Sequence, residues 1–594
     1  MPAAEPPIPE LPRSELPRPE HPRPTLTRSH WFNLNGDWQF EADLNNVGMH
    51  QGWFRDHNFS QTIVVPFSAG SPASGIDAPE DCDIVWYQRT VDIEETWLQQ
   101  KLLLHFGAVD QWAEIFINGH QVGQHRGGYT PFSMDISALA NPGSNLITVR
   151  VADSPRWTQP RGKQAGTTKW PIDYDPIIGI WQTVWLEPVP TIYINDVWCH
   201  YQLQGQLLTV HTRLSGLTSG SIKLELLQDD RLVATHTADF NQRLESRMTF
   251  NVDNPALWSP QSPTLYNLKI SFKDTAGKLV DKVNSYTGLR EITIENSQQL
   301  LNGKPIYLRG VLDQGYFEHG WYTPPNEESM IQDIQLTLDM GFNCVRKHQK
   351  AEDPRFLFLA DQMGLLVWAE MPSGRIFSDE LITTLTDEWL QLVQRDRSHP
   401  CIIAWVPFNE SWGIWHQAER PEQRAFVDGI TSLTRALDNT RPIVGNDGWQ
   451  FSSGDLWTLH LYETETETIA ERLQTLLKDP LSEVVERRSG ALPGAQVSGL
   501  PILLTECGGI GFVENPCGDE FAYGTMPKDS KELERRFERI AKEINRASEL
   551  CGFVWTQLTD VQQETNGVLY FDRTPKMPIG QIKKIIDSIG HEPI

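Results

Sequence analysis

The sequence lacks any apolar segment long enough to cross a membrane. A membrane-spanning helix takes about 20 consecutive apolar residues, and no run in these 594 residues approaches that length. Residues 1–24 are rich in Pro, Glu and Arg and contain no apolar stretch of the kind that a secretory signal peptide needs. We therefore expect a cytoplasmic protein without a membrane partner, in which residues 1–25 form a flexible Pro-rich arm.

Positive charge is also in short supply. The chain carries 51 Lys and Arg against 77 Asp and Glu, which gives a formal net charge of −26. Such a chain is repelled by phosphate backbones, so this balance argues against nucleic acid as a partner.

Cysteine is scarce and scattered. The seven cysteines are odd in number, and no group of Cys and His has the spacing of a zinc site. Reduced thiols in a cytoplasm fit this pattern best. The sequence therefore predicts no bound metal of the zinc type.

What the chain does contain is strand patterning that changes character twice. Residues 26–188 show short alternating strands and a strong hairpin signal at Asn118-Gly119, which is typical of a jelly-roll β-sandwich. Residues 189–289 continue with turns every 8–12 residues, the rhythm of an immunoglobulin-like sandwich. From residue 290 to 594 strands alternate with helices. Eight such strands predict a closed (β/α)8 barrel.

Two buried strands of the predicted barrel end in glutamate. The apolar run 402–406 leads into Asn409 and Glu410, and the run 502–504 leads into Glu506. Burying a carboxylate at such a position costs free energy, so we expect it to have a hydrogen-bonding or charged partner or a functional role. Because the strands of a barrel end at one mouth, we expect both glutamates to meet there. Two carboxyl groups in that arrangement are the minimum set of catalytic groups for glycoside hydrolysis.

Other polar or aromatic residues follow the same strand ends. A barrel built only for stability would not need so many of them at one end. We assign them to substrate binding: Asp313, Arg346, His348, Glu370, Asn409, Asp447, His460, Tyr462 and Trp555.

The neighbours of the two glutamates suggest separate roles. A retaining mechanism needs a proton donor and a nucleophile that stays ionised, with the carboxyl groups about 5–5.5 Å apart. Arg346 and Tyr462 are placed to stabilise an ionised Glu506, which favours Glu410 as acid/base and Glu506 as nucleophile. Strand position alone also permits the reverse assignment.

Several short motifs follow one another along the chain: Asn35-Gly36-Asp37-Trp38, Ile117-Asn118-Gly119, Gly127-Gly128-Tyr129-Thr130-Pro131-Phe132, Gly179-Ile180-Trp181-Gln182, Asn343-Cys344-Val345-Arg346-Lys347-His348, Phe408-Asn409-Glu410-Ser411 and Thr505-Glu506. In these motifs the chain from about residue 30 resembles glycoside hydrolase family two, the family of β-galactosidases, β-glucuronidases and β-mannosidases. The resemblance implies a sugar-binding jelly roll, an immunoglobulin-like domain, a catalytic barrel and hydrolysis of terminal β-linked sugars with retention. It implies no organic cofactor and leaves open a Mg²⁺ or Na⁺ ion near the mouth.

Two departures from the family bear on the substrate. Residues 560–567 contain no Asn-x-Lys of the kind that β-glucuronidases use to hold a carboxylate, which argues against uronic acids. The sequence of residues 347–350 differs from the motif that is usual at this position in galactosidases. We expect a β-galactosidase type of exo-glycosidase, with a pentopyranosidase, a galactofuranosidase and a glucuronidase as alternatives.

A second class of function is a carbohydrate-binding protein whose barrel no longer catalyses. Two sandwiches on a barrel could bind glycans without cutting them, although the intact glutamate pair argues for catalysis. On either reading the expected partner is an oligosaccharide or glycoside, and homo-oligomerisation stays open.

Overall fold

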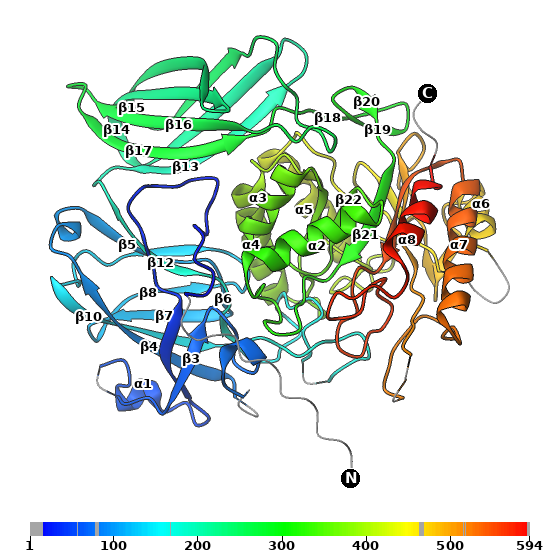
Figure 1. Cartoon of the computed structure of the whole chain (residues 1–594), viewed down its shortest axis with the longest axis horizontal. Helices are drawn as coiled ribbons and strands as arrows, with labels where there is room; N and C mark the ends of the chain where they lie inside the picture. The colour runs from blue at the N-terminus through cyan, green and yellow to red at the C-terminus, as the bar shows by residue number, and fades with distance from the viewer. Residues whose placement is uncertain are drawn as a thin grey trace.

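The structure is a computed structural model that describes residues 16–55, 57–77, 82–166, 168–462, 468–514, 516 and 518–590. Two β-rich domains lie on one side of the molecule, and a barrel ringed by helices lies on the other (Figure 1). The predicted fold class is confirmed: a jelly-roll sandwich, an immunoglobulin-like sandwich and a (β/α)8 barrel follow one another along the chain. Within the described ranges, no helix is long and apolar enough to cross a membrane.

The first domain is a sandwich of two antiparallel sheets, ordered β3-β2-β4-β10-β7-β8 and β1-β12-β5-β9. Asn118 and Gly119 join β7 to β8, and both have positive φ (51° and 78°), as a type I′ turn requires. The predicted hairpin is therefore confirmed. The strands are β1 Phe32–Asn33, β2 Gly36–Ala42, β3 Gln61–Val65, β4 Ile84–Ile93, β5 Lys101–Phe106, β6 Val109–Asp110, β7 Trp112–Ile117, β8 His120–Arg126, β9 Phe132–Asp135, β10 Gly143–Ala152, β11 Gly179–Ile180 and β12 Val184–Val189, with one short helix, α1 Gly48–Gln51.

The second domain is organised around two long strands. β14 pairs with β13 over its first half and with β16 over its second half, and its register with β15 shifts between Arg213 and Thr218. One strand thus serves both layers of a compact sandwich, whose interior is apolar. The strands are β13 Ile194–Gln202, β14 Leu207–Gln228, β15 Arg231–Asn251, β16 Tyr266–Asp274 and β17 Leu279–Thr287.

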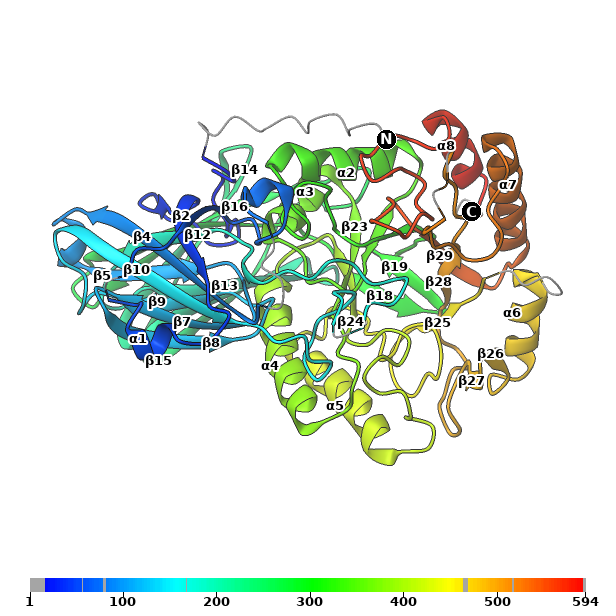
Figure 2. The same cartoon turned by 90° about the horizontal axis from the view of Figure 1, so that it is seen from below.

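The barrel sheet contains seven parallel strands in the order β24-β23-β22-β21-β29-β28-β25. Helices surround it, as Figure 2 shows from below. A small sheet (β18 Ile292–Glu295, β19 Gln298–Leu301, β20 Lys304–Pro305) precedes it, and a hairpin (β26 Glu483–Val485, β27 Arg488–Ser489) lies within it. The barrel elements are β21 Leu308–Asp313, α2 Glu327–Asp339, β22 Cys344–Lys347, α3 Pro354–Met363, β23 Leu366–Glu370, α4 Asp379–Asp396, β24 Ile402–Val406, α5 Pro421–Leu437, β25 Trp457–His460, α6 Ile469–Lys478, β28 Ile502–Gly508, α7 Ser530–Arg546, β29 Leu550–Thr556 and α8 Ile579–Asp587.

The fifth position of the barrel is filled by a segment that is not a regular strand. We predicted a strand at 442–445, and the chain does lie there, between β24 and β25. Val444 N donates to Trp405 O (2.9 Å) on one side, and His460 N donates to Gly448 O (3.1 Å) on the other. Ile443, however, directs its own N–H to the Asp455 carboxylate (2.9 Å). The segment therefore forms only isolated β-bridges, because the loop that follows it accepts one of the backbone hydrogen bonds that a regular strand would give to its neighbour.

Helix ends follow the predicted chemistry. Asp353 caps α3 by accepting from Arg355 N (2.9 Å), and Pro354 occupies the first helical position. Gly364 (φ 80°) ends α3 and Gly341 (φ 89°) follows α2 in the left-handed conformation. These caps fix the residue at which each helix ends before the next strand begins. They thereby help to place the ends of the strands at one mouth of the barrel.

The amino-terminal segment differs from the predicted flexible arm. Residues 1–15 lie outside the described part of the chain, but residues 16–25 pack against the folded domains. Arg18 is 3% exposed and forms an ion pair with Asp353 of the barrel (2.9 Å). Asn35 of the first domain also holds the segment through Pro17 O (3.1 Å). Composition did not predict this packing, because it depends on partners far away in the sequence.

A buried carboxyl group lies where the first domain meets the barrel. Glu388 of α4 accepts a hydrogen bond from Tyr129 N (3.0 Å), and its Oε1 has no hydrogen-bond partner among the described residues. Burial raises the pKa of Glu388 to about 8. The folded protein therefore holds a proton there that the unfolded chain releases near pH 4.5, and this contribution to stability is lost as the pH rises towards 8.

We expect Glu388→Gln to flatten the pH dependence of stability. Glutamine stays neutral, so the variant should lose less melting temperature than the wild type between pH 6 and pH 9, as measured by calorimetry. The matched control is Asp387→Asn, because Asp387 is exposed and adjacent on the same helix. Equal pH dependence in the wild type and Glu388→Gln would contradict the assignment.

Candidate active site

The two predicted glutamates meet at the end of the barrel where the strands terminate. Glu410 follows β24 and Glu506 lies on β28. Glu410 Oε1 lies 2.8 Å from His460 Nδ1, and Glu506 Oε2 lies 3.5 Å from the same nitrogen. One carboxylate oxygen of each glutamate and a His460 nitrogen all lie within 4.8 Å of one another. This spacing suits a retaining pair and is too short for the 6.5–9.5 Å of inverting enzymes.

The backbone at Glu410 is held in an uncommon conformation. Glu410 and Ser411 have φ values of 52° and 59°, in the left-handed region that side chains with a Cβ rarely adopt. Neighbouring residues hold this turn: Glu410 N donates to Asp447 O (2.9 Å), and Ser411 N donates to Asn446 Oδ1 (2.9 Å). The fifth barrel segment thus aims the Glu410 carboxyl group.

Arg346 binds four side chains of the site at once. It is fully buried, and its Nη1 lies 2.9 Å from Glu506 Oε1 and 2.8 Å from Asp447 Oδ2. Its Nε donates to Glu370 Oε2 (2.8 Å), and its Nη2 donates to Asn409 Oδ1 (2.5 Å). The planar guanidinium therefore sets the relative positions of residues on β23 and β28 and of residues that follow β24 and the fifth segment.

His460 is a second cation in this network. Its Nε2 faces Asp447 Oδ2 (2.9 Å), while its Nδ1 faces Glu410. Burial works against the charge, but the Glu506 and Asp447 carboxylates raise the pKa of His460 to about 10. Burial likewise opposes ionisation of Asp447, yet Arg346 and His460 hold the pKa of Asp447 well below its usual range. Both ring nitrogens of His460 therefore face carboxylates.

The two glutamates have unequal surroundings. Glu506 accepts from Arg346 and from Tyr462 OH (2.7 Å), and its side chain is 5% exposed. The Glu410 side chain is 21% exposed, and its carboxylate is bonded to His460. Among the described residues, Glu506 thus has two hydrogen-bond donors, Arg346 and Tyr462, whereas Glu410 has His460 alone and is more open to solvent.

Most of the predicted substrate-binding residues converge on this network. Arg346, Glu370, Asn409, Asp447, His460 and Tyr462 touch a glutamate of the pair or Arg346 directly. His348 lies beside them, with its Nδ1 3.2 Å from Glu370 Oε1 and 3.9 Å from Glu506 Oε1.

The structure corrects the prediction for Asp313 and Trp555. Asp313 binds Lys347 Nζ (2.5 Å), which points away from the glutamates, since successive side chains of a strand face opposite sides. Trp555 is 1% exposed and packs on Phe537 of α7 with ring centroids 4.0 Å apart. Its neighbour Thr556 faces the site instead, where it accepts from Tyr462 OH (3.1 Å). Trp555 is therefore a core residue and offers no platform for a sugar.

A loop of the first domain reaches the barrel mouth. Arg161 N and Gly162 N both donate to Ser373 O (3.0 Å each), which follows β23. The Lys163 ammonium lies 3.1 Å from Glu564 Oε2, and Tyr174 OH donates to the same oxygen. These residues come from two domains, so a local pattern could not reveal their pairing.

A cation and two indoles line the approach to Glu410. Arg488 Nη1 lies 3.5 Å from Glu410 O. Its guanidinium lies over the rings of Trp415 and Trp449, 5.0 and 5.5 Å from their centroids. Sequence reasoning missed all three residues, because Trp415 and Trp449 lie on irregular segments and Arg488 lies on the two-residue strand β27, which is too short to show a periodic pattern.

These features define a class: a three-domain protein with a (β/α)8 barrel that presents two glutamates at hydrolytic spacing. The chain belongs to glycosyl hydrolases family 2. The family's sugar binding domain matches residues 32–190, its second domain matches residues 192–290, and its TIM barrel domain matches residues 292–480.

Two relatives of the chain carry different activities in their names. The chain is 28% identical over 429 residues to a β-galactosidase from Thermoanaerobacter pseudethanolicus, a match that covers 70% of this chain and 55% of that protein. It is 27% identical over 455 residues to a β-glucuronidase from Paenibacillus borealis, covering 70% of this chain and 73% of that protein. The chain thus spans about half the length of the β-galactosidase.

Solved structures show the same fold. A β-glucuronidase from Ruminococcus gnavus in complex with D-glucuronic acid superposes with a TM-score of 0.77 at 21% identity, covering 94% of this chain and 97% of that chain. A β-glucuronidase from an uncultured Clostridium gives a TM-score of 0.76 at 23% identity, covering 94% and 98%.

Proposed function

We propose that this protein is a retaining exo-β-glycosidase. Glu506 attacks the anomeric carbon while Glu410 protonates the leaving oxygen, and water then hydrolyses the glycosyl–Glu506 ester with Glu410 as base. The observation that carries this proposal is the close spacing of the two carboxyl groups, since one oxygen of Glu410 and one oxygen of Glu506 lie within 4.8 Å of each other. The unequal hydrogen-bond donors of the two groups support the assignment of their roles. The Asn409 Nδ2, buried and without a partner among the described residues, is free to donate to a sugar hydroxyl.

We further propose that the terminal sugar is neutral and of the β-galactoside type. A uronate carboxylate needs a cation that no protein carboxylate already holds. Around the two glutamates, Arg346 is bound by three carboxylates and Lys163 by Glu564. Arg488, unpaired among the described residues, lies on the Glu410 side of the site, where we place the leaving group and not the terminal sugar. The Lys163–Glu564 pair offers both donors and acceptors, which suits sugar hydroxyls.

The leaving group lies beside Arg488 and the indole rings of Trp415 and Trp449. The group that protonates the leaving oxygen must lie beside it, so the aglycone occupies the Glu410 side of the site. Trp415 is partly exposed there, and Arg488 has no ion-pair partner within the described ranges. A flat aglycone can stack on this wall, which supports the use of aryl glycosides as substrates.

A panel of 4-nitrophenyl glycosides tests the proposal. We expect turnover of the β-galactoside at least tenfold faster than that of the β-glucuronide. A leading α-arabinopyranoside or β-galactofuranoside would replace the galactoside assignment and keep the neutral-sugar class. Faster turnover of the β-glucuronide would contradict that class, and no release from any member would favour a carbohydrate-binding protein.

Glu564→Gln sharpens the same test. The change leaves the Lys163 ammonium without its carboxylate, so the ratio of β-glucuronide to β-galactoside kcat/KM should rise about tenfold. The double variant Lys163→Met with Glu564→Gln is the control, because it removes the free cation. A ratio that rises equally in both variants would show that the charge of Lys163 does not govern specificity.

A further inference from the structure

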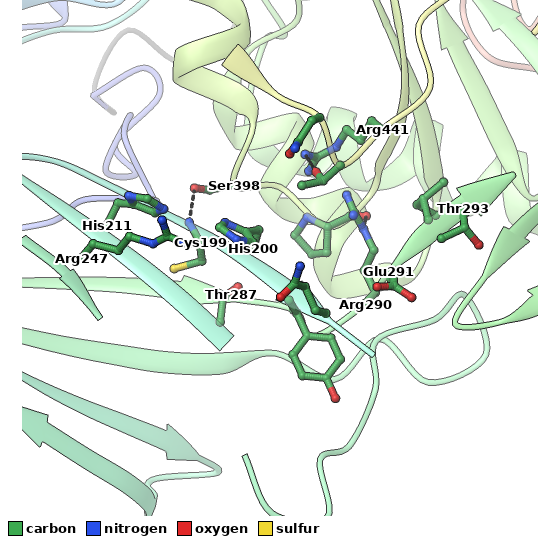
Figure 3. A pocket seen from close by; sticks show the side chains of 17 residues that line it. Cys199, His200, His211, Arg247, Thr287, Arg290, Glu291, Thr293, Ser398 and Arg441 are labelled. Atoms are coloured by element: carbon green, nitrogen blue, oxygen red, sulfur yellow. Dashed lines mark hydrogen bonds between the residues drawn. The ribbon is translucent and has the colours of Figure 1, made fainter. Parts of the chain in front are cut away.

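A cavity of about 470 Å³ lies between the second domain and the barrel, on the side opposite the paired glutamates. Its walls come from β13, from the connection after β17 and from the loops before two barrel strands (Figure 3). Pro400 precedes β24 and Arg441 precedes the fifth segment, so the cavity lies where the barrel strands begin. Glu410 lies beyond the other end of β24, which separates this cavity from the proposed active site.

Arginines outnumber acidic residues in the lining of the cavity, although the whole protein is strongly acidic. Arg247, Arg290 and Arg441 line the cavity, and among the described residues Glu291 is the one acidic residue in its wall. The whole chain has a formal charge of −26. Concentrating three guanidinium groups at one cavity of such a protein points to an anionic occupant.

Arg290 is a buried cation without a counter-ion. It is 6% exposed and donates to Pro400 O (3.1 Å) and Ile402 O (2.9 Å), and no carboxylate lies within ion-pair distance among the described residues. Burial and the neighbouring Arg441 lower the pKa of Arg290 to about 9. Arg441 differs, because Asp438 neutralises it at 2.6 Å. An anion bound at Arg290 would supply the charge that the protein does not provide.

The opposite side of the cavity carries a second unpaired cation. Arg247 of β15 is exposed and forms no ion pair in the described part of the chain. Figure 3 places it beside His211, with Cys199 and His200 between it and Arg290. Burial, together with His200 and Arg247, lowers the pKa of His211 to about 4, so this ring is neutral at pH 7. Neutral imidazoles and the hydroxyls of Thr287 and Thr293 suit the uncharged part of a ligand.

We propose that this cavity binds a small phosphorylated compound. The phosphate group pairs with Arg290, and Arg247 attracts it from the open side. A guanidinium is well matched to phosphate oxygens, which accept two parallel hydrogen bonds from it. A volume of about 470 Å³ exceeds the needs of a free phosphate ion, so the preferred ligand is a phosphate ester of sugar size. This site is independent of glycoside hydrolysis.

Isothermal titration calorimetry on the full-length protein tests the site. The probes are glucose 6-phosphate, inorganic phosphate and glucose, at matched ionic strength. We expect glucose 6-phosphate to bind with a Kd below about 1 mM and at least threefold more tightly than inorganic phosphate, with no binding of glucose. Equal binding of the ester and the free ion would assign the site to phosphate itself. Absence of binding by both phosphates would overturn the proposal.

Two variants locate the binding. Arg247→Gln should weaken glucose 6-phosphate about tenfold while leaving glycoside turnover unchanged, and Arg290→Gln should abolish binding. Arg243→Gln is the matched control, because Arg243 is an exposed arginine on the same strand outside the cavity wall. Melting temperatures check that each variant is folded. Wild-type affinity in Arg247→Gln, or equal losses in Arg247→Gln and Arg243→Gln, would overturn the assignment even if Arg290→Gln does not fold.

Discussion

Replacing either glutamate of the pair by alanine should lower turnover of an aryl β-glycoside about 10³- to 10⁶-fold, because each group acts in a bond-breaking step. Azide should partly restore both variants and reveal their roles through the products. In Glu506→Ala, azide attacks the substrate directly and gives the α-glycosyl azide. In Glu410→Ala, azide attacks the glycosyl–Glu506 ester and gives the β-glycosyl azide. The anomeric configuration is read by NMR.

A control separates chemistry from folding. Glu549→Ala removes an exposed glutamate after α7 whose carboxylate accepts only from Gln474 (3.0 Å) among the described residues. Its activity should stay within twofold of the wild type. Exchanged azide products would reverse the roles of Glu410 and Glu506, and near-wild-type turnover in either alanine variant would end the double-displacement proposal.

Arg346→Met should cause the second largest effect. The change leaves Glu370, Asp447 and Glu506 without their shared cation inside the protein, and breaking a buried ion pair costs about 3–5 kcal/mol. We expect a clear drop in the melting temperature of the barrel and a loss of at least about 10³-fold in kcat/KM. Calorimetry and nitrophenol release measure the two effects.

The pH dependence distinguishes charge repulsion from a simple packing defect. Near pH 5 the uncompensated carboxylates can take up protons, so the difference in melting temperature between Arg346→Met and the wild type should shrink as the pH falls from 8 to 5. Arg346→Lys is the control, since lysine keeps the positive charge but lacks the planar set of N–H donors of the guanidinium. It should recover stability more than activity. A melting-temperature difference that does not change with pH would contradict the electrostatic explanation.

Regular elements of the barrel could be predicted because their signals are local. Asp353-Pro354 and Gly364 mark the two ends of α3, and the apolar run 402–406 marks β24. The fifth position was predicted as a strand from the same kind of run. There the loop carrying Asp455 competes for backbone hydrogen bonds, and a run of side chains does not record that competition.

Side-chain direction was harder to predict than strand position. Trp555 and Thr556 are neighbours at the end of β29, and only one of them can face the mouth. The sequence analysis assigns the aromatic residue to sugar binding, but the structure turns it towards Phe537 and points the threonine at Tyr462. The ring is covered by α7, and the sequence of β29 contains no information about that helix.

The sequence by itself determined the three-domain order, the barrel and the presence of a glutamate at the end of each of two buried strands. These follow from periodicity, capping residues and short motifs, all of which act over a few positions. Only the tertiary structure decided that Arg346 joins four strand ends, that Lys163 of the first domain meets Glu564, and that Arg290 is buried with no counter-ion in the described part of the chain. Charge pairing depends on distance in space, and the closure of the barrel sets that distance between residues far apart in the chain.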